Sequence, residues 1–170
     1  MRLGYWSWQA APSLSNDNIV IEPLASHPQV LGELCTWLEK EWPGWYGAGG
    51  QGSAAADLRA FSSQSGLPFG VVAFASGRLC GMAALKAESI ASHSHLRPWA
   101  GAGLVERSLR GQGIGSMLLH ALEQRAKAEG FRSIYCATGT AQSLLVRHGW
   151  GLLEEVTHDE QRLGVYRKEL

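Results

Sequence analysis

The sequence is poor in cysteine, has no excess of charge of either sign and contains no long apolar run. Its three cysteines, Cys35, Cys80 and Cys136, lie far apart and form no CxxC pair. An odd number of dispersed cysteines argues against both a disulfide framework and a structural zinc site. We therefore expect a reduced, cytoplasmic protein that carries no metal.

The charges of the chain cancel, because Lys plus Arg and Asp plus Glu number 15 each. A balanced chain has no overall field that would attract nucleic acid or an anionic membrane. No stretch reaches the ~18 apolar residues that indicate a membrane span, and residues 1–16 lack the apolar run of a secretory signal. We expect a soluble protein that binds neither nucleic acid nor membrane.

Length and composition favour one globular domain. The chain has 170 residues, of which 45% are hydrophobic and 18% charged. These values suit a single core without a linker or an internal repeat. The expectation is one domain over residues 1–170, in which residues 1–17 form an N-terminal extension.

The spacing of apolar residues predicts a mixture of strands and helices. Strands are expected at 18–23, 69–75, 79–85, 103–106 and 131–137, and a final hairpin within 152–169. Helices are expected at 29–42, 53–63, 114–130 and 141–148. Hairpins combined with one crossover helix imply an α/β (α+β) domain built on a mixed sheet.

Three boundaries follow from local signals. Pro43 and Gly44 are expected to end the helix at 29–42. Thr140 is expected to cap the last helix. The polar segment 87–99, which contains histidines, is expected to be a loop.

The sharpest feature is a glycine-rich loop, residues 110–116, between a strand and the best amphipathic helix. Gly111, Gly113 and Gly115 alternate along it, which lets the backbone turn tightly and approach a ligand. The N-terminus of the following helix adds about half a positive charge. Arg110 adds a forked cation beside the loop. Together these features predict a phosphate-binding loop.

Other interpretations of this loop remain open. A glycine-rich turn can simply connect a strand to a helix. The spacing also loosely resembles a dinucleotide fingerprint, but it begins at residue 111, and only 55 residues follow Gly115, too few for the second half of a doubly wound fold. The GxxxxGK[ST] pattern of nucleoside triphosphatases is absent. A nucleotide- or dinucleotide-binding domain is kept as an alternative.

The loop resembles the signature of the GNAT superfamily of N-acetyltransferases, Arg/Gln-x-x-Gly-x-Gly/Ala, which residues 110–115 match in full. The similarity covers roughly residues 18–170. Within it, Leu104-Val105 resembles the fourth strand of the family, and residues 147–150 (Arg-His-Gly-Trp) resemble the end of its fourth helix. Residues 97–101 (Arg-Pro-Trp-Ala-Gly) are similar to a Pro-Trp-x-x-Gly element of one bacterial branch, with the glycine one residue early.

The resemblance implies both a fold and an activity. The fold would be a mixed, mostly antiparallel sheet flanked by helices, in which the fourth and fifth strands splay apart. The activity would be transfer of an acetyl group from acetyl-CoA, as cosubstrate and without a metal, to a small-molecule or peptide amine by direct attack in a ternary complex. Family members are often dimers, so a homodimer is one expected state, and the segment with Trp6 and Trp8 either serves that interface or packs on its own domain.

The resemblance also implies where acetyl-CoA would bind. The pantetheine arm would pair with the backbone of Leu104, Val105 and Glu106, and the amide of Val105 or Glu106 would polarise the acetyl carbonyl. The residues expected around the pyrophosphate are Arg110, Gly111, Gln112, Gly113, Ile114, Gly115 and Ser116.

The general acid is the point at which the sequence departs from the family. Many members have a tyrosine four residues before the closing glycine, where this chain has Leu145. Tyr135, Cys136 and His148 are the substitutes nearest in sequence, although each also has a purely structural explanation. The missing tyrosine motivates an alternative function, a non-catalytic acyl-CoA-binding module.

The general base and the acceptor pocket are assigned by position. An amine with a pKa near ~10.4 arrives protonated, so a base must remove a proton. Glu106, His93 and His95 are the candidates for this base, against the simpler interpretation that all three are solvated surface groups. Trp45 and Tyr46, beyond the end of the first helix, are expected to form walls of the acceptor pocket.

Overall fold

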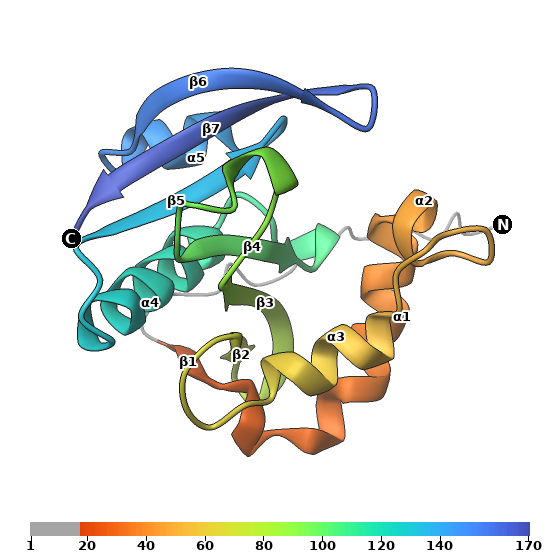
Figure 1. Ribbon diagram of the computed structural model, residues 1–170. Helices are drawn as coiled ribbons and strands as arrows, with labels where there is room; N and C mark the ends of the chain where they lie inside the picture. Colours follow the sequence, from red (N-terminus) through yellow and green to blue (C-terminus); the bar gives the residue numbers. More distant parts are fainter. Residues whose placement is uncertain (1–17) are drawn as a thin grey trace, which may run out of the picture.

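The computed structural model describes residues 18–170. Seven strands form one sheet in the order β1-β2-β3-β4-β5-β7-β6 (Figure 1). The strands are β1 Ile19–Pro23, β2 Phe69–Ala75, β3 Arg78–Lys86, β4 Trp99–Val105, β5 Ser133–Thr138, β6 Gly151–His158 and β7 Gln161–Glu169. All neighbours are antiparallel except β4 and β5, which are parallel. The expected mixed, mostly antiparallel sheet is confirmed, whereas the expected extension at 1–17, with Trp6 and Trp8, lies outside the described residues.

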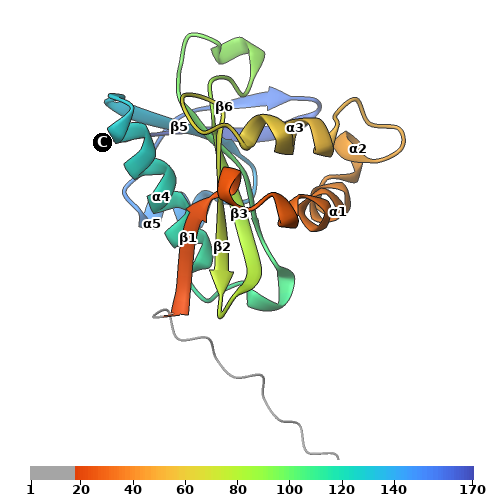
Figure 2. The same ribbon diagram turned by 90° about the horizontal axis from the view of Figure 1, so that it is seen from below.

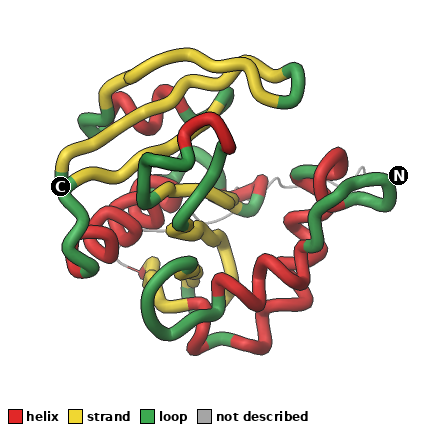
Figure 3. Tube along the Cα trace, in the orientation of Figure 1, coloured by secondary structure: helices red, strands yellow, loops and turns green. Residues whose placement is uncertain are grey.

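Helices cover both faces of the sheet. They are α1 Leu31–Glu41, α2 Pro43–Tyr46, α3 Ala54–Phe61, α4 Ile114–Ala128 and α5 Gln142–Arg147. Single 3-10 turns occur at η2 Leu24–Ser26, η3 Pro28–Val30, η4 Ala91–His93 and η5 Arg107–Leu109. Figure 2 shows α4 and α5 on one side of the first strands and α1 to α3 on the other, and Figure 3 separates the elements by kind. Within residues 18–170, no helix combines the length and the apolar content that crossing a membrane requires.

Two hydrophobic cores lie on opposite faces of the central strands. Side chains alternate between the faces of a strand. Accordingly, Val71 and Ala73 of β2 join the core under α4, whereas Val72 between them joins the core under α1 and α3. In β3, Ala83 and Leu85 likewise alternate with Met82 and Ala84. This burial on both faces explains why β2 and β3 read as continuous apolar runs rather than as alternating strands.

The strand β4 begins earlier than the sequence predicts. We expected a loop up to Trp99 and a strand from residue 103, but the strand runs over Trp99–Val105 and Glu106 lies just beyond it. Glycine and alanine have little intrinsic preference for strands. Pairing of Trp99 with Lys86 on β3, together with complete burial of the indole ring, fixes the strand instead.

Three smaller boundaries also differ from expectation. The helix predicted at 29–42 begins at Leu31, after the turn η3. Pro43 ends that helix but also opens the short helix α2, because proline suits the first position of a helix. Thr140 does not cap the last helix; the Oγ1 of Thr138 accepts hydrogen bonds from the amides of Thr140 and Ala141, at 3.1 and 3.0 Å.

The strands β4 and β5 touch only at one end. Trp99 with Tyr135 is the one residue pair that joins them in the described chain, and the strands then diverge. On the other side of β4, the ladder to β3 is interrupted at Ala102 and Gly103, where Ala102 has a positive φ of 48°. A bulge of this kind bends a strand away from its partner. The predicted splaying of the fourth and fifth strands is thereby confirmed.

A buried carboxylate holds α4 to the C-terminal half of the sheet. Glu123, which is 6% exposed, accepts a hydrogen bond from the indole N–H of Trp150 at 2.9 Å. Its second oxygen lies 2.8 Å from the ammonium of Lys168 on β7. Removing one partner of a buried pair leaves the other partners unsatisfied, and that penalty exceeds the net value of the contact.

Glu123→Ala is therefore expected to reduce the free energy of unfolding by about 3 kcal/mol. For a chain of this length, that loss lowers Tm by roughly 6–12 °C. Urea unfolding followed by circular dichroism measures the change. The matched control is Glu129→Ala on the same helix, where a partly exposed pair with Arg125 is lost and the expected cost is under ~1 kcal/mol. Equal losses in the two variants would contradict this account of Glu123.

Candidate functional site

A cavity of about 610 Å³ opens where β4 and β5 diverge. One wall is β4 from Ala100 to Val105, and the opposite wall is the end of β5 from Cys136 to Thr138. The first turns of α4, the start of α5 and the tip of the β6–β7 hairpin complete the lining, together with the ring of Trp42. Most of these side chains are apolar, so the cavity suits an elongated ligand that bonds mainly to backbone.

The glycine-rich loop stands at the start of α4, beside this cavity. Gly111 and Gly113 have φ values of 77° and 86°, a conformation that other residues adopt only with strain. Among residues 18–170, no acceptor pairs with the backbone amides of residues 111–116, and no side chain caps the helix. Six free amides at the N-terminus of a 15-residue helix form an arrangement that favours an anion.

Arg110 ties the loop to its surroundings. Its Nε donates to the carbonyl oxygen of Val105 at 2.9 Å, and its terminal nitrogen lies 3.1 Å from both carboxylate oxygens of Glu41, at the end of α1. Much of its charge is therefore met by Glu41. The sequence predicts Arg110 as a forked cation beside the loop, and in this structure its guanidinium also joins the loop to β4 and α1.

Ser116 and His148 connect α4 to α5. The Oγ of Ser116 lies 2.9 Å from Nε2 of His148, a residue that follows the last turn of α5. Both side chains are half-buried. The imidazole of His148, which was a candidate for the general acid in the sequence analysis, is therefore engaged in a contact with Ser116.

The three expected catalytic residues do not meet in one place. Glu106 lies at the carboxyl end of β4, where its carboxylate accepts a hydrogen bond from the hydroxyl of Ser108 and faces Arg78 at 3.9 Å. The Ser108 hydrogen bond, helped by Arg78, holds the pKa of Glu106 below its usual range. A carboxylate of lowered pKa is a weak base.

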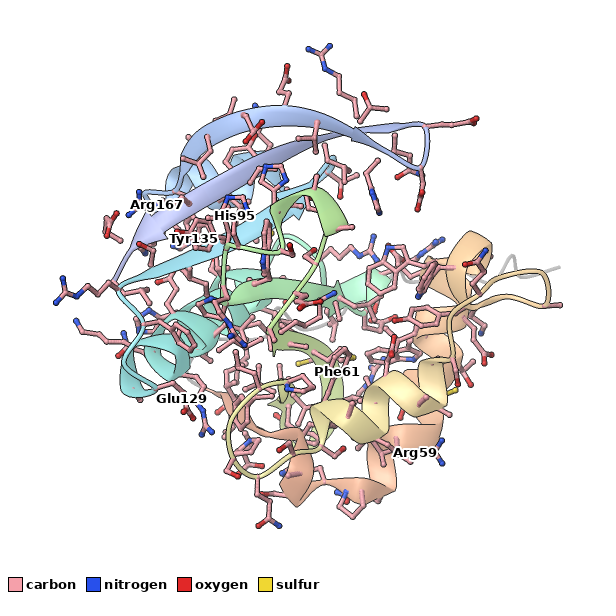
Figure 4. The ribbon with its side chains drawn as sticks, viewed as in Figure 1. Arg59, Phe61, His95, Glu129, Tyr135 and Arg167 are labelled. Atoms are coloured by element: carbon pink, nitrogen blue, oxygen red, sulfur yellow. The ribbon has the colours of Figure 1, made fainter. Side chains whose placement is uncertain are left out.

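His95 and Tyr135 lie near the other end of β4 (Figure 4). The exposed His95 stacks on His93, with ring centroids 5.9 Å apart, and Tyr135 packs against Trp99 at 5.7 Å. Nε2 of the buried His93 lies 2.8 Å from Glu154 on β6. None of these rings lines the cavity, so the structure gives them contacts that account for their presence without catalysis.

The aromatic residues that follow α1 differ in whether they line the cavity. The Tyr46 hydroxyl donates to Asp57 on α3 at 2.6 Å, and Trp45 is 48% exposed. Neither lines the cavity, whereas Trp42 does. Sequence reasoning placed Trp42 in the first helix and missed it as a cavity residue, although its position directly before Pro43, at a forced change of chain direction, is a usable signal.

Leu145 and Cys136 face the cavity from opposite elements. Leu145 is 1% exposed and has no proton to give, so the position of the family tyrosine lies at the cavity but cannot supply an acid there. Burial raises the pKa of the Cys136 thiol to about 12. One residue that the sequence did not single out, Lys86 on β3, lies close to Gly101 and near enough to Cys136 to influence its pKa.

A comparison with models of protein families identifies one family. A family model described as "Acetyltransferase (GNAT) family" matches residues 31–150. No curated protein matches the chain.

Solved structures share its fold at low sequence identity. An aminoglycoside 6′-N-acetyltransferase in complex with coenzyme A has a TM-score of 0.71 at 15% identity, over 88% of this chain and 96% of that chain. A GCN5-related N-acetyltransferase from Kribbella flavida has a TM-score of 0.72 at 19% identity, over 92% and 100%. An aminoglycoside 6′-N-acetyltransferase from Enterococcus faecium has a TM-score of 0.70 at 16% identity, over 88% and 96%.

Cys136 is expected to react slowly with alkylating reagents, although it lines the cavity. At pH 8 a thiol with a pKa of about 12 is almost wholly protonated, and only the thiolate is nucleophilic. In a variant that carries Cys35→Ser and Cys80→Ala, the rate of alkylation by iodoacetamide should be roughly a thousandfold below that of N-acetylcysteine. The rate should also rise about tenfold per pH unit between pH 7 and 9. Labelling as fast as the reference would identify Cys136 as a nucleophile.

Proposed function

The chain belongs to the acetyltransferase (GNAT) family, and on this premise we propose that it transfers an acetyl group from acetyl-CoA to an amine. The observation that carries the proposal is the set of free amides at residues 111–116, beside a cavity between two diverging strands. A phosphate group needs such donors, and an extended arm needs such a cavity. The two features adjoin at Val105 and Gly115, which both line the cavity.

The residues present fit acetyl-CoA. The amides from Gly111 to Gly115, with Ser116 nearby, would hold the pyrophosphate without any contribution from the Arg110 guanidinium. The edge of β4 that faces the cavity, around Leu104 and Val105, would pair with the amide groups of the pantetheine arm. Bound acetyl-CoA would supply an acetyl group activated as a thioester.

The backbone of β4 would also assist the reaction. The amide of Glu106 donates to the carbonyl of Cys80 at 3.0 Å, so it is not free to polarise an acetyl carbonyl. The bulge at Ala102 and Gly103 interrupts the ladder with β3 and lies on the cavity wall. Of the two amides expected to polarise the acetyl carbonyl, we therefore keep that of Val105, drop that of Glu106 and add those of this bulge, because a donor held rigidly in an apolar cavity has its largest effect.

The acceptor is proposed to be an amine that approaches from the side of α1 to α3. Two of the structures with this fold are aminoglycoside 6′-N-acetyltransferases, which makes a polyamine-like small molecule a reasonable first probe. Trp42, the aromatic residue that reaches the cavity from that side, would contact the acceptor. The low identity of these structures leaves a peptide amine as an equal candidate.

Leu145 supports a second candidate, a non-catalytic acyl-CoA-binding module. The position that many family members use for a proton donor is apolar and fully buried in this chain. Such a module would bind CoA without turnover on any amine. A thiolate can leave without a proton donor, however, so the transferase proposal does not require a tyrosine at this position.

Acetyl-CoA and CoA are expected to raise the melting temperature of the protein, while NAD and ATP are not. A ligand at 100 times its Kd adds ~2.7 kcal/mol, or roughly 5–10 °C for a chain of this size. Thermal-shift measurements with each of the four ligands check this. Detection of free thiol in the presence of an aminoglycoside, a diamine, amino-acid amides and a short peptide then separates the transferase from the module. A larger shift with NAD or ATP would contradict the acetyl-CoA assignment.

Gly113→Val is expected to weaken CoA binding at least tenfold, because a β-branched residue cannot hold the φ of 86° that aims the loop amides. Isothermal titration measures the affinity. Gly77→Val is the matched control, since Gly77 has a φ of 77° in the hairpin between β2 and β3, far from the loop in sequence. Both variants should lose similar stability. Normal CoA binding by Gly113→Val would show that the pyrophosphate site is wrongly placed.

A further inference from the structure

Lys86 is the last residue of the strand β3, and α1 to α3 cover one side of the first strands (Figure 2). Lys86 has the same parity in the strand as Met82 and Ala84, which pack under those helices. Its side chain runs along the neighbouring strand from its partner Trp99 toward Gly101. A Cβ placed on Gly101 would stand 3.3 Å from Cε of Lys86 and 3.6 Å from Nζ. Gly101 lines the cavity and Lys86 itself does not, so the amine of Lys86 lies directly beside a residue of the cavity wall.

The surroundings of Lys86 disfavour its charge. Within residues 18–170, the amine makes no hydrogen bond and no ion pair, and the side chain is half-buried. The titratable groups that influence it are Asp57 on α3 and Cys136 on β5. The carboxylate of Asp57 already accepts the hydroxyl of Tyr46, and Cys136 is held as a neutral thiol. Burial lowers the pKa of Lys86, and these two groups oppose the shift only in part.

A lysine whose pKa is lowered by burial is neutral in a larger fraction of molecules and can accept a proton more readily at a given pH. General bases work best when their pKa lies near the operating pH, and burial is a recognised means of bringing lysine there. The other candidates already have partners within the fold, because Glu106 accepts a hydrogen bond from Ser108 that lowers its pKa, and the rings of His95 and Tyr135 pack on His93 and Trp99. Lys86 is also on the side from which the acceptor is proposed to enter.

We propose that Lys86 is the base that takes a proton from the ammonium group of the acceptor at the cavity wall formed by Gly101. This inference rests on the proposed function. In the step, one N–H bond of the acceptor ammonium breaks and one N–H bond forms on Nζ, so the acceptor gains a free lone pair and Lys86 becomes an ammonium ion. Lys86 returns its proton to solvent after the acetylated product leaves.

The ionisation of Lys86 can be measured without an acceptor. The chain has four lysines, Lys40, Lys86, Lys127 and Lys168, so reductive ¹³C-methylation gives few NMR signals. The Lys86→Arg variant identifies the signal of Lys86. We expect this signal to titrate at a lower pH than the other three lysines in the full-length protein. Titration of all four together would overturn the proposal.

The role in transfer is tested on the amine that the unaltered protein acetylates. Lys86→Met should keep the thermal shift with CoA, lose about 10²- to 10⁴-fold in kcat and lose the rise of activity with pH, since the base must be neutral to act. Lys86→Arg should not restore activity, because arginine stays protonated. Lys40→Met, on the exposed side of α1, is the control and should match the unaltered protein.

The outcomes separate this inference from the proposed function. If Lys86→Arg restores kcat, or if Lys86→Met raises KM alone, Lys86 binds an anionic group of the acceptor as a cation and is not a base. If Lys86→Met keeps the full rate and pH profile, Lys86 has no part in the transfer. If the unaltered protein shifts with CoA but acetylates no amine in the panel, the transferase proposal itself fails, whatever the lysine titration gives.

Discussion

The divergence of β4 and β5 after a single residue pair is the constraint on which the rest of the structure depends. Buried backbone donors and acceptors must find partners, and strands that part in the middle of a sheet leave such groups facing a cavity. The bulge at Ala102, the small residues along β4 and the start of α4 all follow from keeping this gap open. An extended ligand could therefore pair with the backbone groups that face this gap. The glycine-rich loop lies where an anionic end of such a ligand would arrive.

Polar groups near an apolar cavity can be sorted by whether they have a partner within the fold. Burying an unpaired polar or charged group costs free energy, so such groups are rare unless they have a partner or a task. His93, Tyr46 and Glu123 have partners within the fold, at 2.8, 2.6 and 2.9 Å respectively. Lys86 has none among the described residues. The unpaired amine of Lys86 next to Gly101, rather than nearness in sequence to a motif, therefore makes this residue a candidate for chemistry.

The sequence predicts those parts of the molecule that local physics controls. The amphipathic pattern of residues 114–130 and the two apolar runs at 69–75 and 79–85 are local signals, and α4 and the β2–β3 hairpin appear where they indicate. The turn of the glycine-rich loop is predictable for the same reason, since the positive φ at Gly111 and Gly113 favours glycine. The beginning of β4 at Trp99 is not, because its pairing with β3 is tertiary. Nor are the ion pair of Arg110 with Glu41 and the approach of Lys86 to Gly101, which join residues that are 69 and 15 positions apart.

The ion pair between Arg110 and Glu41 has a consequence for how two ligands affect each other's binding. It spans from the loop before α4 to the last turn of α1, next to Trp42, and so connects the two sides of the cavity. A ligand that displaces either side must stretch or break this ion pair. A second ligand then binds without the free-energy cost of breaking it. Such sharing is cooperativity, and it acts equally in both directions. Because the arginine side chain is 46% exposed, the shared free energy is at most ~1 kcal/mol, which corresponds to roughly a fivefold change in affinity.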